Sequence, residues 1–552
     1  MDNQRLFLVI ALVFVLFLIW QAWMEEQAAK TLPSQAVVTG EPAPPSSTTE
    51  AAPRQDLPSV PAIPGVPAAK LLDTSQRIQV ITDMFVAEID ATGGDLRHVG
   101  LRAYPQSLED KNQPFVLLQD SPPEIYIAQS GLIASTGAAP NHYARFAPEQ
   151  TEYRLQDGQD VLNVKLTWQG EAGVKVVKVY TFRRGSYVID VKQQVENGSV
   201  EEWRGSPYWQ LQRTPPASSG GGWGTGVYTY TGGVISTPEK VYEKISFSDM
   251  AKENLDRQVL GGWLAMIQHY FVAAWVPAQD QTNAFYSKAV DDSRYVLGMV
   301  GPQGVVPAGA VGEFHSRLYA GPKIQSALQQ VAPNLQLTVD YGFLTIIAEP
   351  LFWLLEKIHS VLGNWGWAIV VLTVLIKLAF YKLSETSYKS MANMRRLAPE
   401  LTKLKERYGD DKQRMNQAMM EMYRKEKINP LGGCLPIVVQ IPVFIALYWV
   451  LLESVEMRQA PFILWIQDLS VKDPYFVLPL IMGATMLIQQ KLNPPPPDPM
   501  QAKVMMALPI VFTFMFLWFP AGLVLYWVVN NVLSIAQQYV ITKRVEAGLN
   551  KA

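Results

Sequence analysis

Five apolar segments near the end of the chain limit its possible folds more than any other feature. They cover residues 365–381, 435–452, 474–488, 504–519 and 523–541, and a further uncharged run covers residues 6–23. A helix needs about 20 mainly apolar residues to cross a bilayer, and several of these runs are near the short limit. The sequence therefore predicts a polytopic α-helical membrane protein with six spans.

Lys377 lies inside the first of the five late segments. A cation in hydrocarbon costs roughly 3 kcal/mol, so an ionisable residue at this depth is a functional hypothesis by default. The alternative is that the ammonium extends along the helix to the headgroups, where Lys382 already lies. Taken alone, Lys377 does not decide between these two interpretations.

Charge is divided unevenly along the chain. Residues 1–340 carry 26 Lys and Arg against 34 Asp and Glu, whereas residues 341–552 carry 21 against 15. Two compartments would produce this division, and it argues against direct binding of nucleic acid. Cys434 is the single cysteine, and the five histidines lack zinc-type spacing, so we expect neither a disulfide nor a metal or other cofactor.

The first 340 residues predict an anchor, a linker and a β domain. Residues 1–24 indicate an uncleaved signal-anchor span rather than a cleaved signal peptide. Residues 25–70 are rich in proline and predict an extended linker. Residues 71–340 predict a large extracytoplasmic all-β domain, because Leu162, Val164 and Leu166 alternate with polar residues and two strands flank the turn at 183–186. The apolar stretch 263–276 predicts core strands rather than a span.

The remaining residues predict a helical region with several parts. Residues 341–363 predict an amphipathic helix on the outer membrane surface, with an apolar stripe that contains Ile347, Leu351 and Leu354. A five-span core over 364–545 contains a cytoplasmic helical hairpin at 384–428, and residues 546–552 form a short tail. Positive charge in the hairpin and negative charge in the loop 453–473 predict cytoplasmic N- and C-termini.

Methionines are frequent in the predicted hairpin. Met391, Met394, Met415 and Met419 follow helical spacing. Such side chains offer a soft surface that accepts varied apolar segments. The alternative is that they only pack the two hairpin helices together, and the sequence favours this second interpretation slightly.

Polar residues recur in the spans that accompany Lys377. They are Thr373 in the same span, Gln440 in the third, Thr485 in the fourth, and Asn531 and Ser534 in the last. Polar groups in lipid normally point into the bundle or a water-filled cavity. Interhelical hydrogen bonds would explain one or two of them. A cation with polar groups on several helices favours a hydrated groove.

Several motifs resemble the YidC/Oxa/Alb insertase family, in its Gram-negative form with a large periplasmic domain. They are Gly-Asp-Asp-Lys-Gln-Arg at 409–414, Lys-Ile-Asn-Pro-Leu-Gly-Gly-Cys at 427–434, Arg-Gln-Ala-Pro-Phe at 458–462 and Phe-Pro-Ala-Gly-Leu-Val-Leu-Tyr at 519–526. The order of anchor, β domain, amphipathic helix, hairpin and five spans also agrees over essentially the whole length.

The resemblance implies a periplasmic β-supersandwich and a five-helix core around a hydrophilic groove. The groove cation of the family falls on Lys377, where the family more often has Arg; Lys keeps the charge but not the planar fork that clamps carboxylates. Gln440 matches a polar groove position. Tyr526 and Trp527 match an aromatic pair that contacts substrate, and we place Phe444 in the same groove.

The resemblance further implies a non-enzymatic insertase and chaperone of the bacterial inner membrane. Its expected partners are nascent membrane proteins, the Sec translocon with its accessory subunits, the ribosome and the lipid bilayer. Three alternatives stay open: a secondary transporter that couples through Lys377, an intramembrane protease, and sugar binding by the β domain. The protease is disfavoured because no histidine lies in any predicted span.

Overall fold

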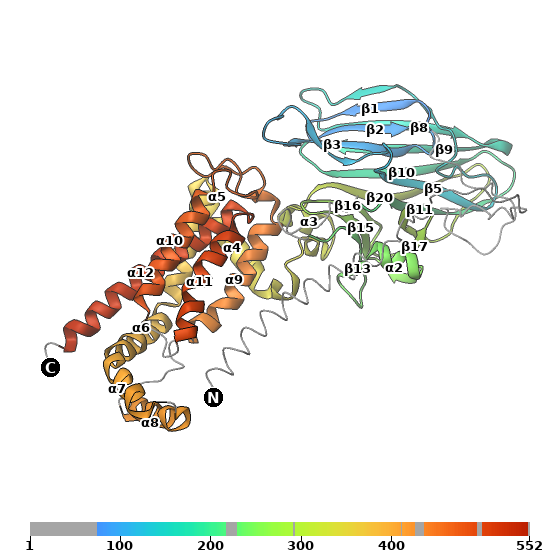
Figure 1. Cartoon of the computed structure of the whole chain (residues 1–552). Helices are drawn as coiled ribbons and strands as arrows, with labels where there is room; N and C mark the ends of the chain where they lie inside the picture. Colours follow the sequence, from blue (N-terminus) through green and yellow to red (C-terminus); the bar gives the residue numbers. More distant parts are fainter. Residues whose placement is uncertain are drawn as a thin grey trace, which may run out of the picture. The chain divides into compact units, whose positions relative to one another are not determined.

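A computed structural model describes residues 74–216, 229–290, 293–409, 411–425, 435–493 and 499–549. The predicted signal-anchor span, the whole of the predicted linker and the end of the C-terminal tail lie outside these residues. The chain forms two compact units, one with the described residues up to Val339 and the other with those from Asp340 onward. Figure 1 shows that the first unit is built of strands and the second of helices.

The first unit contains two sheets. The eleven-stranded sheet has the order β14 (Asp256–Leu260), β17 (Thr282–Ala289), β18 (Tyr295–Val300), β11 (Trp203–Arg213), β5 (Tyr126–Thr136), β3 (Asp95–Pro105), β2 (Phe85–Asp90), β1 (Arg77–Ile81) and β7 (Glu152–Arg154), with β19 (Gly304–Val306) beside β11 and β4 (Pro114–Leu118) beside β3. The nine-stranded sheet has the order β13 (Glu243–Ile245), β12 (Gly232–Ser236), β15 (Trp263–Ile267), β16 (Phe271–Val276), β20 (Val311–Pro322), β10 (Val188–Asn197), β9 (Val174–Arg183), β8 (Val161–Gln169) and β6 (Ala147–Pro148). Two short helices, α2 (Phe247–Lys252) and α3 (Gln325–Val331), complete this unit.

The strand patterns predicted from the sequence are confirmed in this unit. β8 buries Val164 and Leu166 on either side of the exposed Lys165, and Leu162 is half-buried. β9 and β10 form the predicted antiparallel hairpin, with Phe182 opposite Ile189. The stretch 263–276 forms β15 and β16, and every side chain of these two strands is buried. Alternation on one strand and continuous apolar runs on another are the two ways in which strands supply a sandwich core.

A charged cluster lies in the core between the two sheets. Lys178 of β9 donates from Nζ to the carbonyl oxygens of Gly93 and Ser130, each at 2.7 Å. Asp95 of β3 accepts from Gln129 at 2.8 Å. Burial lowers the pKa of Lys178 to about 8, although the Asp95 carboxylate opposes this shift. Burial also raises the pKa of the Asp95 carboxyl, against the pull of Arg97 and Lys178. The hydrogen bond from Lys178 to Ser130 joins β9 of the nine-stranded sheet to β5 of the eleven-stranded sheet.

The second unit contains nine described helices. They are α4 (Thr345–Leu362), α5 (Trp365–Ala379), α6 (Tyr381–Arg396), α7 (Ala398–Tyr408), α8 (Lys412–Lys425), α9 (Leu435–Glu453), α10 (Val477–Leu492), α11 (Pro499–Phe516) and α12 (Ala521–Leu549). No described helix taken singly has both the length and the apolar composition expected of a membrane span. α5 and α6 meet these criteria together but are bent by 67° at the break between them.

The region predicted as a hairpin over 384–428 is arranged differently in detail. α6 packs against α12 and α9, and only α7 and α8 pair with each other. Ser384 and Ser387 are the buried residues of α6, and they follow Lys377 by seven and ten positions. The sequence of α6 is polar overall, so it predicted part of a cytoplasmic loop. In the structure, its small polar side chains allow α6 to pack closely against the long helix α12.

The face that α4 buries also differs from the predicted stripe. Ala348, Phe352 and Leu355 are buried, where α4 packs against α5 and α9. The predicted stripe at 347, 351 and 354 is half-buried beside them. Ile346 and Trp353 are exposed on a third side. The apolar arc of this helix is wider than a single stripe, so the sequence alone did not decide which part of it packs.

Candidate functional site

A set of polar side chains from four helices meets along α12. We call it the α12 polar cluster: Lys377, Gln440, Thr485, Asn530, Asn531 and Ser534. Asn530, Asn531 and Ser534 occupy neighbouring positions on α12, because residues three or four apart share a helix face. α5, α9 and α10 all contact α12, and each supplies one of the other members.

Lys377 is 5% exposed and points to α12. Its Nζ donates to Ser534 Oγ at 2.8 Å, and Ser534 Oγ donates to the Asn530 carbonyl at 2.7 Å. Among the residues that the structure describes, no carboxylate pairs with Lys377. The alternative in which this ammonium extends to the headgroups is not the conformation found here.

Two more hydrogen bonds join helices through the cluster. Gln440 of α9 donates to Asn530 Oδ1 at 3.0 Å, and Asn531 donates to Thr485 Oγ1 of α10 at 3.3 Å. Thr373 is buried but does not join the cluster, since its hydroxyl donates to the Ile369 carbonyl of its own helix at 2.7 Å. The structure thus brings five of the polar residues selected from the sequence to α12, where Asn530 joins Gln440 to Ser534 and Asn531 bonds Thr485 separately.

The three predicted aromatic residues of the site are in contact. The Phe444 ring lies 5.8 Å from Tyr526 and 4.5 Å from Trp527, in the second case edge to face. Trp527 also lies 5.0 Å from Phe516 of α11. Aromatic rings in such contacts form a stiff apolar wall. The site therefore combines a buried cation of α5, bonded to α12, with an aromatic surface formed by α9 and α12.

The surroundings of this cluster extend along α12 to Gln538, which the polar spacing of the last span predicts, and onto α6, which the sequence did not predict. Gln538, four residues after Ser534, donates to Asn493 Oδ1 at 3.1 Å. On α6, Ser387 is buried and Tyr388 approaches the Ser534 hydroxyl. The helical spacing from Ser534 to Gln538 is visible in the sequence. The position of α6 beside Ser534 depends on the bend between α5 and α6, and no pattern in the sequence predicts that bend.

The hairpin methionines divide into two groups. Met394, Met419 and Met422 pack around the buried Leu397 and Tyr423. Met391 and Met415 are half-buried, and Met420 is exposed. Packing between helices accounts for the first group, so at most part of the predicted contact surface is free to meet another molecule.

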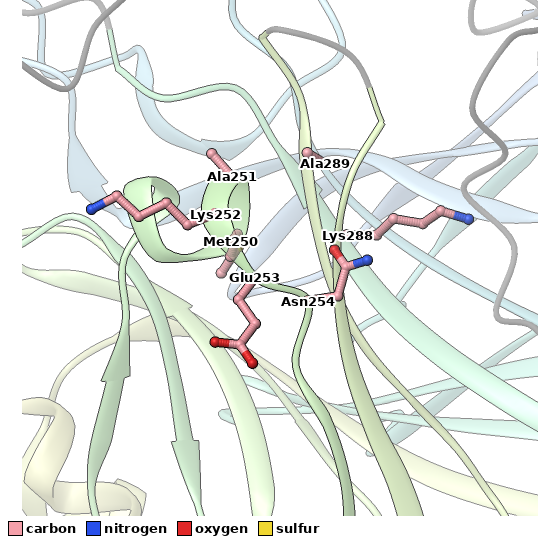
Figure 2. Close-up of a pocket in the computed structure, with 7 residues that line it drawn as sticks. All are labelled: Met250, Ala251, Lys252, Glu253, Asn254, Lys288 and Ala289. Carbon is pink, nitrogen blue, oxygen red and sulfur yellow. The ribbon is translucent and has the colours of Figure 1, made fainter.

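The β unit contains a hollow of about 250 Å³ beside α2. Figure 2 shows that the ammonium groups of Lys252 and Lys288 point away from each other. Ligand sites normally have polar groups that converge on one point. The divergence of these two ammonium groups gives the sugar-binding alternative no support at this hollow.

Comparison with known proteins covers both units. The family model described as the YidC periplasmic domain matches residues 77–354, and that described as the 60Kd inner membrane protein matches residues 357–548. The membrane protein insertase YidC of Nitrosococcus oceani is 52% identical over 99% of both chains, and that of Methylococcus capsulatus is 53% identical over the whole of both.

Solved structures resemble the chain more weakly. A crystal structure of an active YidC insertase is 16% identical with a TM-score of 0.38, and it covers 85% of this chain and 93% of its own. A galactose mutarotase related enzyme from Lactobacillus acidophilus has a TM-score of 0.31, 11% identity, and covers 44% of this chain and 97% of its own. Both similarities are too weak to assign a fold or a role.

The full-length relatives and the two family models agree with each other. They support a bacterial inner-membrane insertase with a large periplasmic β-sandwich domain and a helical C-terminal region, and they give the transporter alternative no support. An insertase performs no covalent chemistry on its client. The chain belongs to the YidC family of membrane protein insertases.

Proposed function

We propose that this chain moves short hydrophilic segments of newly made membrane proteins across the bilayer through a groove at the α12 polar cluster. The observation that carries this proposal is the Lys377 ammonium, which is buried, held by a neutral hydroxyl and not neutralised by a described carboxylate. A cation in this state attracts an incoming acidic side chain more strongly than a paired one does.

The energetic problem is the transfer of polar backbone through hydrocarbon. Each unsatisfied backbone group costs several kcal/mol there. Polar side chains from α5, α9, α10 and α12 offer replacement partners along part of the path. The membrane potential adds about 2.3 kcal/mol for each negative charge that moves outward across 100 mV. The aromatic wall of Phe444, Tyr526 and Trp527 would support the apolar part of the client.

We also propose the topology that the charge pattern predicts. The chain crosses the membrane six times, both termini are cytoplasmic and the β domain is periplasmic. α5 to α12 supply five of these spans, with α7 and α8 in the cytoplasm, where basic residues are concentrated. Nascent membrane proteins are the clients. The Sec translocon, its accessory subunits and the ribosome are the proposed partners.

Insertion into vesicles that contain only this purified chain tests the proposal. The client is a small membrane protein with an acidic periplasmic tail, compared with the same client carrying a neutral tail. Lys377→Ala should lower the yield of protease-protected acidic-tail product by about tenfold, which corresponds to ~1.4 kcal/mol. Lys377→Arg should insert both clients.

Two results would contradict the proposal. Equal yields with the original chain, Lys377→Ala and Lys377→Arg would remove the role of the cation. The absence of product with every variant would point to a chaperone that needs the translocon. Detergent-solubilised Lys377→Ala should first show an unfolding midpoint close to that of the original chain, so that a loss of yield reports on the site.

A further inference from the structure

The loop that joins α9 to α10, residues 454–476, is held rigidly by its own polar groups. Asp473 is 1% exposed and accepts from Trp465 Nε1 at 3.0 Å and from the backbone N–H groups of Tyr475 and Leu478 at 3.0 and 2.8 Å. Phe462 N–H donates to the Ile466 carbonyl at 2.9 Å and closes the tip at 463–465. A buried carboxylate with three donors fixes the loop in one conformation.

The loop is attached to the first turns of α5 and α12. Asn364, which caps α5, donates to the Phe462 carbonyl at 3.1 Å. The Phe462 ring lies 5.3 Å from Trp367, and a Cβ at Gly366 would meet that ring at 2.0 Å. On the other side, Ala521 N–H donates to the Val471 carbonyl at 2.7 Å. The loop therefore lies level with the ends of the helices that we assign to the membrane.

The tip of the loop has two unfavourable features at one residue. Leu464 has a φ of +53°, a region that L residues other than Asn and Asp rarely occupy. The same side chain is 74% exposed, and the neighbouring Ile463 is also exposed. In water, both the backbone conformation and the exposed aliphatic groups cost free energy, with nothing to offset them.

The residues around the tip have the composition of a membrane interface. The rings of Trp465 and Tyr475 are 6.4 Å apart, and Tyr475 is 67% exposed. Lys472 is exposed and its Nζ lies 5.9 Å from the Phe476 ring. Trp and Tyr are concentrated where lipid headgroups meet acyl chains, and Lys extends there to the headgroups. A dry protein interface would instead be depleted in lysine.

We propose that this loop is an anchor whose tip, Ile463 and Leu464, inserts into the outer leaflet of the bilayer. The conformation of Leu464 directs an aliphatic side chain away from the protein. Transfer of this side chain from water into lipid lowers its free energy. Trp465, Tyr475 and Lys472 lie at the headgroup level. The anchor fixes the depth of α5, α9, α10 and α12 at their outer ends. This inference rests on the proposed function only in assigning these helices to the membrane.

Site-specific fluorescence tests the anchor directly. The sequence has one cysteine, so a Cys434→Ser background allows single labelling with an environment-sensitive dye. Leu464→Cys is the test position. Gln467→Cys is the matched control, because Gln467 is exposed in the same loop and bonds the Leu464 carbonyl at 2.8 Å. Leu480→Cys, at an exposed apolar position of α10, reports contact with the acyl chains. The full-length variants are reconstituted into phosphatidylcholine and phosphatidylglycerol vesicles.

The expected result is a blue-shifted emission at position 464, quenched about twofold more than at 467 by lipids spin-labelled near the headgroup. Water-like emission at 464 with quenching at 480 overturns the anchor and leaves the span assignment intact. A blue shift at 464 without lipid quenching identifies a protein contact and also overturns it. Quenching at neither 464 nor 480 overturns the span assignment together with the anchor.

The insertion assay separates this inference from the proposed function. Lipid quenching at 464 combined with full insertion by Lys377→Ala would support the anchor and reject the role of the groove cation. Water-like emission at 464 with impaired insertion by Lys377→Ala would do the reverse. Leu464→Gly, which relieves the positive φ, should keep the fold while lowering the quenching of a label at 463.

Discussion

A buried lysine lies in each unit, Lys178 in the β unit and Lys377 in the helical unit, and the two have opposite surroundings. In the β unit, Lys178 is fully buried, donates to the carbonyl oxygens of Gly93, Gly94 and Ser130, and has Asp95 and the Phe146 ring nearby. In the helical unit, Lys377 is nearly as buried but bonds one hydroxyl, with no carboxylate partner among the described residues. A buried cation whose partners are complete contributes to the fold. One whose partners are incomplete is available to another molecule.

Lys178→Met should give the largest effect on stability. The substitution leaves the carbonyls of Gly93 and Ser130 without this donor and removes a cation beside Asp95. Breaking such a buried cluster on one side costs about 3–5 kcal/mol. Chemical denaturation of the full chain, followed by tryptophan fluorescence, measures this.

Two matched variants sharpen the same comparison. Lys165→Met, on the exposed side of β8, should change stability by less than about 0.5 kcal/mol. Lys377→Met should also be neutral or stabilising, because no described carboxylate loses its partner. A loss of several kcal/mol in Lys377→Met would show that both lysines are structural.

The pH dependence of the β unit provides the second prediction. The folded pKa of Lys178 is about 8 and its ordinary value is 10.5, so between these values the unfolded chain binds more protons than the folded chain. The free energy of unfolding should therefore rise with pH across this window, by an amount on the order of 1–3 kcal/mol. Urea denaturation at pH 7.5, 9 and 10.5 would follow it. The increment should be absent in Lys178→Met, and an unchanged slope in that variant would assign it to other groups.

Ser534 should have a smaller effect, and it should appear in insertion rather than in stability. Its hydroxyl holds the Lys377 ammonium against α12, and a hydrogen bond to a charged group contributes about 1.5 kcal/mol or more. Ser534→Ala should lower insertion of an acidic-tail client about fivefold to tenfold and leave a neutral-tail client unaffected. Ser534→Thr should restore insertion. Equal losses for both clients would indicate a general packing defect.

Gln440→Leu should have the smallest effect on stability. It removes the bond to Asn530, and interhelical hydrogen bonds in membranes contribute about 0.6 kcal/mol on average. If the α12 polar cluster is a wet groove, insertion falls more than this small change in stability would explain. If the cluster only joins helices, insertion stays unchanged. Parallel unfolding and insertion measurements on the same preparation distinguish the two.

Local patterns predicted much of the β unit, but the burial of Lys178 was not predicted. The strand that begins at Val174 alternates inward and outward, and the same alternation places Lys178 on the inward side with Val176 and Tyr180. The alternation was therefore visible in the sequence, but it was used to place only the apolar residues of this strand. Its partner Asp95 could not be predicted, because β3 and β9 belong to different sheets and no periodicity relates them.

The sequence predicted many residues of the candidate site, as it predicted many strands of the β unit, but not how they are connected. Lys377, Gln440, Asn531 and Ser534 were identifiable because a polar residue in an apolar segment is conspicuous. The sequence did not predict that Asn530 joins Gln440 to Ser534 or that Thr373 bonds its own helix. It also did not predict that α6 packs against α12. The packing of Met394 and Met419 around Tyr423 likewise needed the tertiary structure, since a methionine stripe has the same spacing whether it faces a partner or a neighbouring helix.

The sequence by itself determined the apolar segments, the strand alternation, the lone cation in an apolar run and the family, because each depends on residues close in the chain or on their order along it. Tertiary structure decided that Lys178 has a nearby carboxylate while Lys377 bonds a hydroxyl, and it decided which face of α4 packs. It also decided that Leu464 is presented at the tip of a rigid loop. Those outcomes depend on which groups distant in the chain meet, and the free energy of a buried charge or an exposed aliphatic group is set by these neighbours rather than by its own residue type.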